Sequence, residues 1–166
     1  PGTMERLGLG PDVLLERNIF RRNNVEQLTG YYPAAVKIFN QSHRVTCRDN
    51  LVLDNPHSNG IWYDVGNVDG VFVNNWVEGA QLGFFFEISK GVVAAGNVFV
   101  NCDKGVRVLN SSNARVYHNT FVNTPASFEM TSNACPVALF LATTVAPGMT
   151  PPPESATTPD RDCVPP

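Results

Sequence analysis

Apolar and polar residues alternate in short runs along residues 12–124, and the same run recurs at intervals of 22 to 32 residues. Each copy carries a phrase that opens with asparagine, and these asparagines are Asn18, Asn50, Asn75, Asn97 and Asn119. The positions five before, three before and two after each asparagine are apolar or small in every copy. Alternation of this kind is typical of strands with one buried face. Each copy therefore predicts short strands flanking its asparagine.

A second strand is predicted ahead of each of the last four asparagines, at residues 36–40, 61–65, 84–88 and 106–110. Alternation points every other side chain inward, which predicts a buried set of Ile61, Tyr63, Val65, Phe84, Phe86, Ile88, Val106 and Val108. Gly60, Gly83 and Gly105 precede three of these strands, and we expect tight corners there.

A repeat of this length indicates a solenoid, because one coil cannot bury its apolar face without a neighbour. Short strands with sharp corners favour an all-β parallel β-helix of about five coils of about 22 residues. The asparagines would then stack as a ladder, each amide bonding the next coil. A leucine-rich repeat is the rival solenoid, but its leucine frame and helical pattern do not occur in the chain.

The chain divides into three parts by composition. Residues 1–11 form a lead-in, 12–124 the repeat, and 125–166 a tail rich in Pro, Thr and Ala that we expect to be disordered or loosely packed. Residues 138–142 are apolar and could cover the open end of the solenoid. Because the lead-in is too short to cap the other end, we expect a truncated fragment of a longer protein.

Composition narrows the classes of function. Twelve basic residues against 15 acidic ones give no sign of nucleic-acid binding, and the apolar runs are too short to cross a membrane. No apolar signal segment opens the chain. The four cysteines lack metal-ligand spacing, so neither a metal nor a cofactor is predicted. We expect Cys47 to be a buried thiol, and a disulfide between Cys135 and Cys163 is possible.

The outward positions of the second strand group carry unusual residues. One outward column reads Lys37, Trp62, Phe85 and Arg107, and the next reads Phe39, Asp64, Glu87 and Leu109. The aromatic pair predicts an exposed platform on which a sugar could stack, and the two cations could bond hydroxyls or carboxylates of a substrate. His57, in the loop just before, could reach the same face.

Asp64 and Glu87 hold the same position in successive coils. Adjacent strands lie about 4.8 Å apart, so the two carboxylates should be roughly 5 Å apart on an open face. Retaining glycosidases hold their nucleophile and acid/base at about 5–5.5 Å. Two carboxylates this close repel, so one should keep its proton to higher pH. Ordinary solvated acids are the alternative, and a calcium site is disfavoured because only two carboxylates converge.

The stretch 12–124 resembles the right-handed parallel β-helix repeat proteins, many of which act on carbohydrates. Within that group, the run Gly60-Ile-Trp-Tyr-Asp64, followed one coil later by Phe86-Glu87-Ile88, is similar to the paired motif of β-helical β-xylosidases, glycoside hydrolase family 120. The chain departs from that motif at Val65-Gly66, where the family has Trp-Met, and at 90–92, where it has His-Gly-Pro. The family's β-sandwich insertion is also absent from this sequence.

The resemblance implies a retaining glycosidase with Asp64 as nucleophile and Glu87 as acid/base. It also implies an oligo- or polysaccharide partner and an extracellular or periplasmic location. A polysaccharide lyase or uronate epimerase is the second enzymatic interpretation, with Arg107 or Lys37 neutralising the substrate carboxylate. A non-catalytic carbohydrate-binding or structural β-helix is the third.

Overall fold

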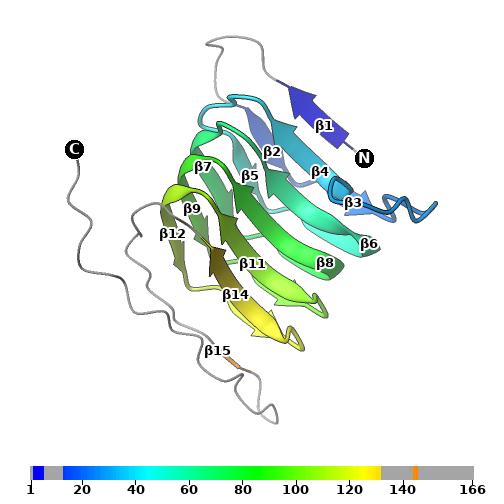
Figure 1. Cartoon of the computed structure of the whole chain (residues 1–166). Helices are drawn as coiled ribbons and strands as arrows, with labels where there is room; N and C mark the ends of the chain where they lie inside the picture. Colours follow the sequence, from blue (N-terminus) through cyan, green and yellow to red (C-terminus); the bar gives the residue numbers. More distant parts are fainter. Residues whose placement is uncertain (1, 6–12, 132–143, 146–166) are drawn as a thin grey trace.

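The computed structural model describes residues 2–5, 13–131 and 144–145, and in these residues all regular structure is β-strand. Parallel strands stack coil upon coil into a solenoid, as predicted (Figure 1). One sheet has five strands, which are β2 (Leu14–Glu16), β5 (Thr46–Arg48), β7 (Val68–Val73), β9 (Lys90–Ala95) and β12 (Ser112–Tyr117).

The second sheet has ten strands and supplies the other two faces of the solenoid. The long strands β6 (Leu51–Tyr63) and β8 (Trp76–Glu87) belong to both faces. Their first halves pair in a row with β3 (Ile19–Arg21), β10 (Val98–Val100), β13 (Thr120–Val122) and β15 (Thr144–Val145). Their second halves pair in a row with β1 (Gly2–Glu5), β4 (Ala34–Phe39), β11 (Lys104–Leu109) and β14 (Ala126–Thr131). We call this second row the site face.

The core fills the inside of the solenoid with aromatic and aliphatic side chains from all three faces. Phe72 and Phe84 stack with ring centroids 4.2 Å apart, and Phe99 and Phe121 stack at 5.2 Å. The one phenol of this cluster, Tyr63, donates its hydroxyl to the carbonyls of Val45 and Val71. The predicted inward position of Tyr63 is therefore confirmed, and its polar atom is satisfied inside the core.

The asparagine ladder is present as predicted. Each Oδ1 accepts bonds from both the backbone N–H and the side-chain amide of the asparagine one coil earlier, at 2.9–3.1 Å for the buried members. Each buried amide also donates to a backbone carbonyl, as Asn97 does to Phe72 at 2.9 Å. A second, shorter ladder runs through Asn67, Ser89 and Ser111 at the next corner. The ladders satisfy buried polar groups where the strands turn.

Two local predictions were wrong. Gly60, Gly83 and Gly105 lie inside strands rather than at corners. Neighbouring atoms leave no room for a side chain at these positions: a Cβ at Gly83 would lie 2.4 Å from the Phe99 ring. Val65 and Ile88 do not point into the core. Both adopt positive φ at the corner that follows the site face, and Ile88 is left 48% exposed.

The sheet extends beyond the repeat read from the sequence. β14 pairs with β11 in parallel at residues 126–131, past the predicted end at residue 124, and the backbone of β1 pairs with β4 within the predicted lead-in. The apolar run 138–142 and the cysteines Cys135 and Cys163 lie outside the described residues. Cys47 is fully buried, as expected, and burial raises the pKa of its thiol to about 12.

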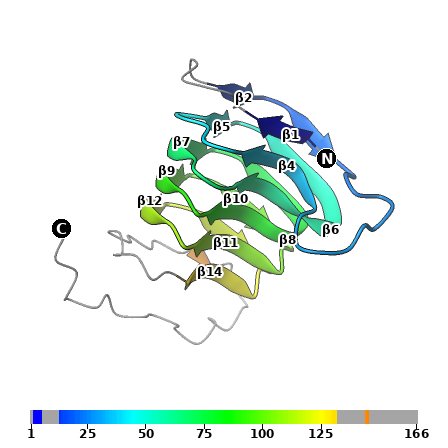
Figure 2. The ribbon, with the colours of Figure 1, turned by 45° about the horizontal axis from the view of Figure 1, so that its top comes forward.

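Residues 22–33 form an insertion between β3 and β4, which we call the cover segment. Figure 2 shows it as a loop beside β6. Asn24 holds the segment together by bonding both backbone groups of Leu28, and it attaches the segment to β6 by donating to the carbonyl of His57 at 2.8 Å. At its other end the carbonyl of Pro33 accepts from the N–H of Asn59. The cover segment therefore lies against the site face.

Candidate functional site

The two acidic residues lie side by side at the end of the site face. Glu87 is the last residue of β8, Asp64 directly follows β6, and the register aligns Tyr63 with Phe86 one position earlier. Asp64 is therefore beside Glu87 on the next coil, as predicted. The open surface predicted around them was wrong, because Asp64 is only 5% exposed and Glu87 only 6%.

Asp64 is paired with Lys37 of the preceding coil. The Lys37 Nζ lies 2.8 Å from Asp64 Oδ2, and both side chains are nearly buried. The same ammonium lies 3.7 Å from the centroid of the Trp62 ring and 4.8 Å from that of Tyr32. The carboxylate and the ring faces together compensate the desolvated cation. Lys37 is therefore engaged with Asp64 and is not free to bind a substrate, contrary to our expectation.

Glu87 is bonded by a residue that the repeat pattern did not identify. The hydroxyl of Tyr31, from the cover segment, donates to Glu87 Oε1 at 2.5 Å. The Tyr31 ring packs edge-on against Trp62 at 5.3 Å and against Phe85 at 6.3 Å. The cover segment thus places a phenol directly over the acidic pair.

The two carboxyl groups have different environments. The pKa of Glu87 is raised, chiefly because burial disfavours its charged form. The Tyr31 hydrogen bond lowers this pKa, the charge of Asp64 and a hydrogen bond with it raise the pKa further, and the charge of Lys37 lowers it. Burial also raises the pKa of Tyr31, so its hydroxyl remains a donor. The site therefore raises the pKa of Glu87 beside an Asp64 that is paired with a cation.

The predicted aromatic platform was wrong. Trp62 and Phe85 do share an outward column, and their rings stack at 4.8 Å, but Trp62 is fully buried and Phe85 is 1% exposed. With Ala34 and Leu82 they form a second apolar cluster outside the solenoid core. The cover segment and the Lys37 side chain lie over this cluster, so neither ring offers an open face.

Arg107 is paired one coil further on. Its Nε lies 3.4 Å from Glu129 of β14, and Lys104 forms a second ion pair with the same carboxylate. The guanidinium carbon also lies 5.4 Å from the centroid of the Phe85 ring. Glu129 was missed because it falls beyond the last asparagine phrase. Arg107 is thus near the site but has a partner other than substrate.

His57 lies away from the acidic pair. It is seven residues before Asp64, in the irregular part of β6 between Asn55 and Asn59. It lines a separate hollow of about 180 Å³ together with Gln81 of β8 and residues 27–30 of the cover segment. We therefore do not include His57 in the site.

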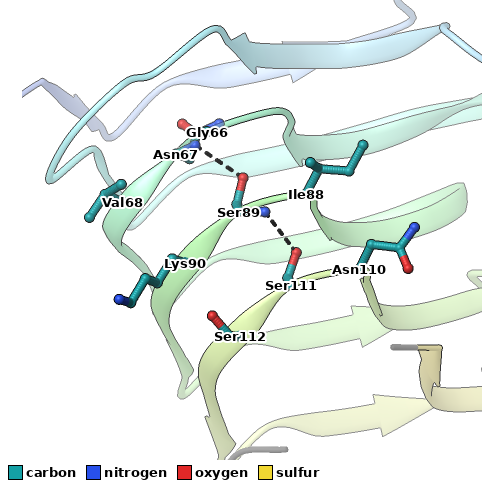
Figure 3. A pocket seen from close by; sticks show the side chains of 9 residues that line it. All are labelled: Gly66, Asn67, Val68, Ile88, Ser89, Lys90, Asn110, Ser111 and Ser112. Atoms are coloured by element: carbon teal, nitrogen blue, oxygen red, sulfur yellow. Dashed lines mark hydrogen bonds between the residues drawn. The ribbon is translucent and has the colours of Figure 1, made fainter. Parts of the chain in front are cut away.

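A second hollow, of about 270 Å³, follows the corner immediately after the acidic pair. Its lining residues come from three successive coils and are Gly66, Asn67, Val68, Ile88, Ser89, Lys90, Asn110, Ser111 and Ser112. Figure 3 shows Ser89 and Ser111 on successive coils, with the ladder bonds drawn as dashed lines. Ser89 Oγ accepts from Asn67 and donates to the Glu87 carbonyl, so the ladder already uses this hydroxyl.

Among the described residues, no group of three or more His, Cys, Asp or Glu side chains gathers to hold a metal ion. In the same residues, no helix has the length and apolar character needed to cross a bilayer.

One sequence signal could have revealed Tyr31. The first two asparagines of the ladder are 32 residues apart, whereas the last two gaps are 22 residues, and the difference marks an insertion of about ten residues. Its position over the site could not be read from that gap.

Comparison with known proteins gives one match. A family model described as the right-handed beta helix region matches residues 6–121. Neither the curated proteins nor the solved structures give a significant match to the chain.

Proposed function

The chain belongs to the right-handed β-helix family, and from this premise we propose that it is a retaining glycoside hydrolase that resembles the β-helical β-xylosidases. One observation carries the proposal: two nearly buried carboxyl groups stand side by side on adjacent coils, in different electrostatic environments. Paired carboxyl groups with separated proton affinities are the minimum that glycoside hydrolysis requires.

In the proposed mechanism Glu87 is the acid. Its carboxyl group, whose pKa burial raises, gives a proton to the glycosidic oxygen as the bond to the anomeric carbon breaks. Asp64 attacks that carbon and forms a glycosyl–enzyme ester. Glu87, now ionised, takes a proton from water as the water attacks the ester, which releases the sugar with its original anomeric configuration.

Lys37 would act on Asp64 and not on the sugar. Its ammonium orients the Asp64 carboxylate through the 2.8 Å contact. As the ester forms, the charge of Asp64 is lost, so the ion pair weakens during the first step and is restored in the second. Lys37 is therefore a positioning residue in this proposal.

The charges around the pair favour a neutral sugar. Lys37 faces Asp64, while Arg107 and Lys104 face Glu129, so each of these cations already has an acidic partner. A lyase or uronate epimerase needs a cation to neutralise the substrate carboxylate, and that alternative is disfavoured here. An oligosaccharide partner and an extracellular or periplasmic location come from the same resemblance and are part of the proposal.

Isosteric variants and two leaving groups test the assignment. We expect Asp64→Asn to lose turnover of every aryl glycoside by 10³-fold or more, on the order of the effect of removing a nucleophile. Glu87→Gln should lose turnover of a poor leaving group, such as phenol, but keep much of it on a dinitrophenyl glycoside, which needs no protonation. Azide should rescue Glu87→Gln and give the glycosyl azide with retained configuration.

Asp69→Asn is the matched control, because Asp69 is an exposed acid at a corner of a neighbouring strand. It should behave as the unmodified chain. If Asp64→Asn and Glu87→Gln fold and turn over both substrates at the parent rate, the glycosidase proposal fails. Oligosaccharide binding without any turnover would instead support the non-catalytic carbohydrate-binding interpretation.

A further inference from the structure

The phenol of Tyr31 occupies the position that a ligand of the acidic pair would need. Its hydroxyl donates to Glu87 Oε1, the carboxyl group proposed to face the glycosidic oxygen. Its ring lies against Trp62 and Phe85, the two aromatic side chains nearest the pair on the same strands. A six-membered ring bearing a hydroxyl is thus already bound there, and it belongs to the chain itself.

The contacts of Tyr31 are those of a ligand more than those of a core residue. Tyr31 lies outside the strands and remains 49% exposed, whereas Trp62 beneath it is fully buried. Its edge-on ring contacts and its one hydrogen bond are each worth only about 1 kcal/mol. Removing this side chain from the surface of the site would therefore leave the solenoid core intact.

The backbone next to Tyr31 allows the side chain to move away. Gly30 has φ +121, and no atom lies within 4 Å of the position that a Cβ would take there. The same glycine lines the 180 Å³ hollow between the cover segment and β6 and β8. Residues 25–30 are all exposed, so few buried contacts resist a shift of this end of the segment.

A buried donor beneath Tyr31 has no partner in the closed arrangement. The indole Nε1 of Trp62 is buried and makes no hydrogen bond within the part of the chain that is described. An unsatisfied buried donor costs about 1–3 kcal/mol. Tyr31 accepts no hydrogen bond from this nitrogen, whereas a ring that carries several hydroxyls offers oxygen acceptors.

We propose that the space filled by the Tyr31 phenol is a binding site for a hydroxyl-bearing ring, and that such ligands bind by displacing Tyr31. That the natural ligand is a sugar rests on the proposed function. The existence of the binding site does not rest on the proposed function, because the Tyr31 ring already fills it in the structure.

An empty site should accept a replacement phenol. In Tyr31→Ala, millimolar p-cresol, the side chain of tyrosine as a free molecule, should raise the Tm by several degrees. Toluene has the same ring but cannot donate to Glu87, so it should raise the Tm less. The unmodified chain should show little response, because Tyr31 still occupies the site. If p-cresol stabilises folded Tyr31→Ala no more than it stabilises the unmodified chain, the proposal is overturned.

Tyr31→Phe keeps the ring and removes only the hydroxyl, which guards against an unfolded alanine variant. Amide hydrogen exchange in residues 22–33 should become faster in Tyr31→Phe and stay unchanged in Tyr32→Phe. Equal exchange in the two variants would show that the bond to Glu87 does not hold the segment closed, and the proposal would fail.

Kinetics separate this inference from the proposed function. If the chain hydrolyses aryl glycosides, Tyr31→Ala should lower KM, by about ten-fold if Tyr31 fills the site nine-tenths of the time. An unchanged or raised KM counts against displacement while leaving hydrolysis standing. Stabilisation of Tyr31→Ala by p-cresol in a chain that hydrolyses nothing would instead support the binding site and reject the glycosidase.

Discussion

Glu87 and Asp64 show how one residue type acquires two roles from its neighbours. Both are carboxylic acids on adjacent coils and both are nearly buried. Asp64 faces the ammonium of Lys37, whereas Glu87 faces a neutral phenol. A cation stabilises the ionised form, and burial without one stabilises the protonated form. Burial raises the pKa of Glu87 and the Tyr31 hydrogen bond acts against that rise, whereas Asp64 has a cation as its partner.

The pH dependence of stability should report the protonation of Glu87. Its pKa is raised above 4.5 in the folded chain, so it stabilises the fold fully at low pH, and this contribution is lost as pH rises through the folded pKa. Glu87→Gln cannot ionise, so the Tm of this variant minus the Tm of the unmodified chain should increase as the pH is raised from 4.5 to 8. Glu26→Gln, at an exposed position, is the control; a constant Tm difference between Glu87→Gln and the unmodified chain would refute the raised pKa.

Removing the Lys37 ammonium should lower the free energy of unfolding, because the buried Asp64 carboxylate loses its partner. Lys37→Met keeps most of the side-chain volume but leaves Asp64 without its partner, and we expect a loss of about 3 kcal/mol in urea unfolding at pH 7. In Lys37→Met/Asp64→Asn much of that loss should return. If the single and double variants unfold at the same urea concentration, the ion pair is not coupled as the 2.8 Å distance indicates.

At the scale of the element, each strand is held by the coil on either side and by ladders at the corners. The buried asparagines bond both to one another and to backbone carbonyls. Close packing adds a second constraint, since Phe99 and Phe121 press on Gly83 and Gly105. Glu87 ends β8 and Asp64 directly follows β6 at the corner that carries the second ladder, and this ladder fixes the backbone on which the site depends.

The ladder should be most sensitive at its middle. Asn97→Ala removes the acceptor of two bonds from Asn75 and leaves buried donors unpaired, so we expect a loss of about 3 kcal/mol or more. Asn18→Ala, at the end of the ladder, should cost less, because no coil before it depends on its Oδ1 within the described residues. Chemical denaturation of both variants measures the difference, and equal losses would contradict a ladder that acts through neighbours.

The whole molecule is a stack in which each coil contacts mainly the coils beside it. In such a molecule the core contacts join only neighbouring coils, so the stability is approximately the sum of the stabilities of the coils and of the interfaces between them. The site spans three coils, with Lys37 on β4, Asp64 after β6 and Glu87 on β8. The cover segment is the exception, because Tyr31 reaches past the adjacent coil to bond Glu87, 56 residues later.

Protection from hydrogen exchange should follow the stack. Amides of β7 and of the second half of β8, in the middle coils, should exchange at least about ten-fold more slowly than those of β2 and β14 near the ends. The reason is that opening from an end breaks one interface, whereas opening in the middle breaks two. Mass spectrometry of peptic peptides measures this, and uniform protection along the chain would indicate a single cooperative unit instead.

The sequence by itself determined the repeat, the ladder, the inward position of Tyr63 and the adjacency of Asp64 and Glu87. These follow from alternation along a strand and from parallel stacking at a constant spacing, so counting residues from each asparagine is enough. Only the tertiary structure decided what surrounds the pair. The cover segment is an insertion with no register, and the burial of Trp62 and Phe85, the bond from Tyr31 to Glu87 and the pairing of Lys37 with Asp64 depend on how that segment and those side chains pack in three dimensions.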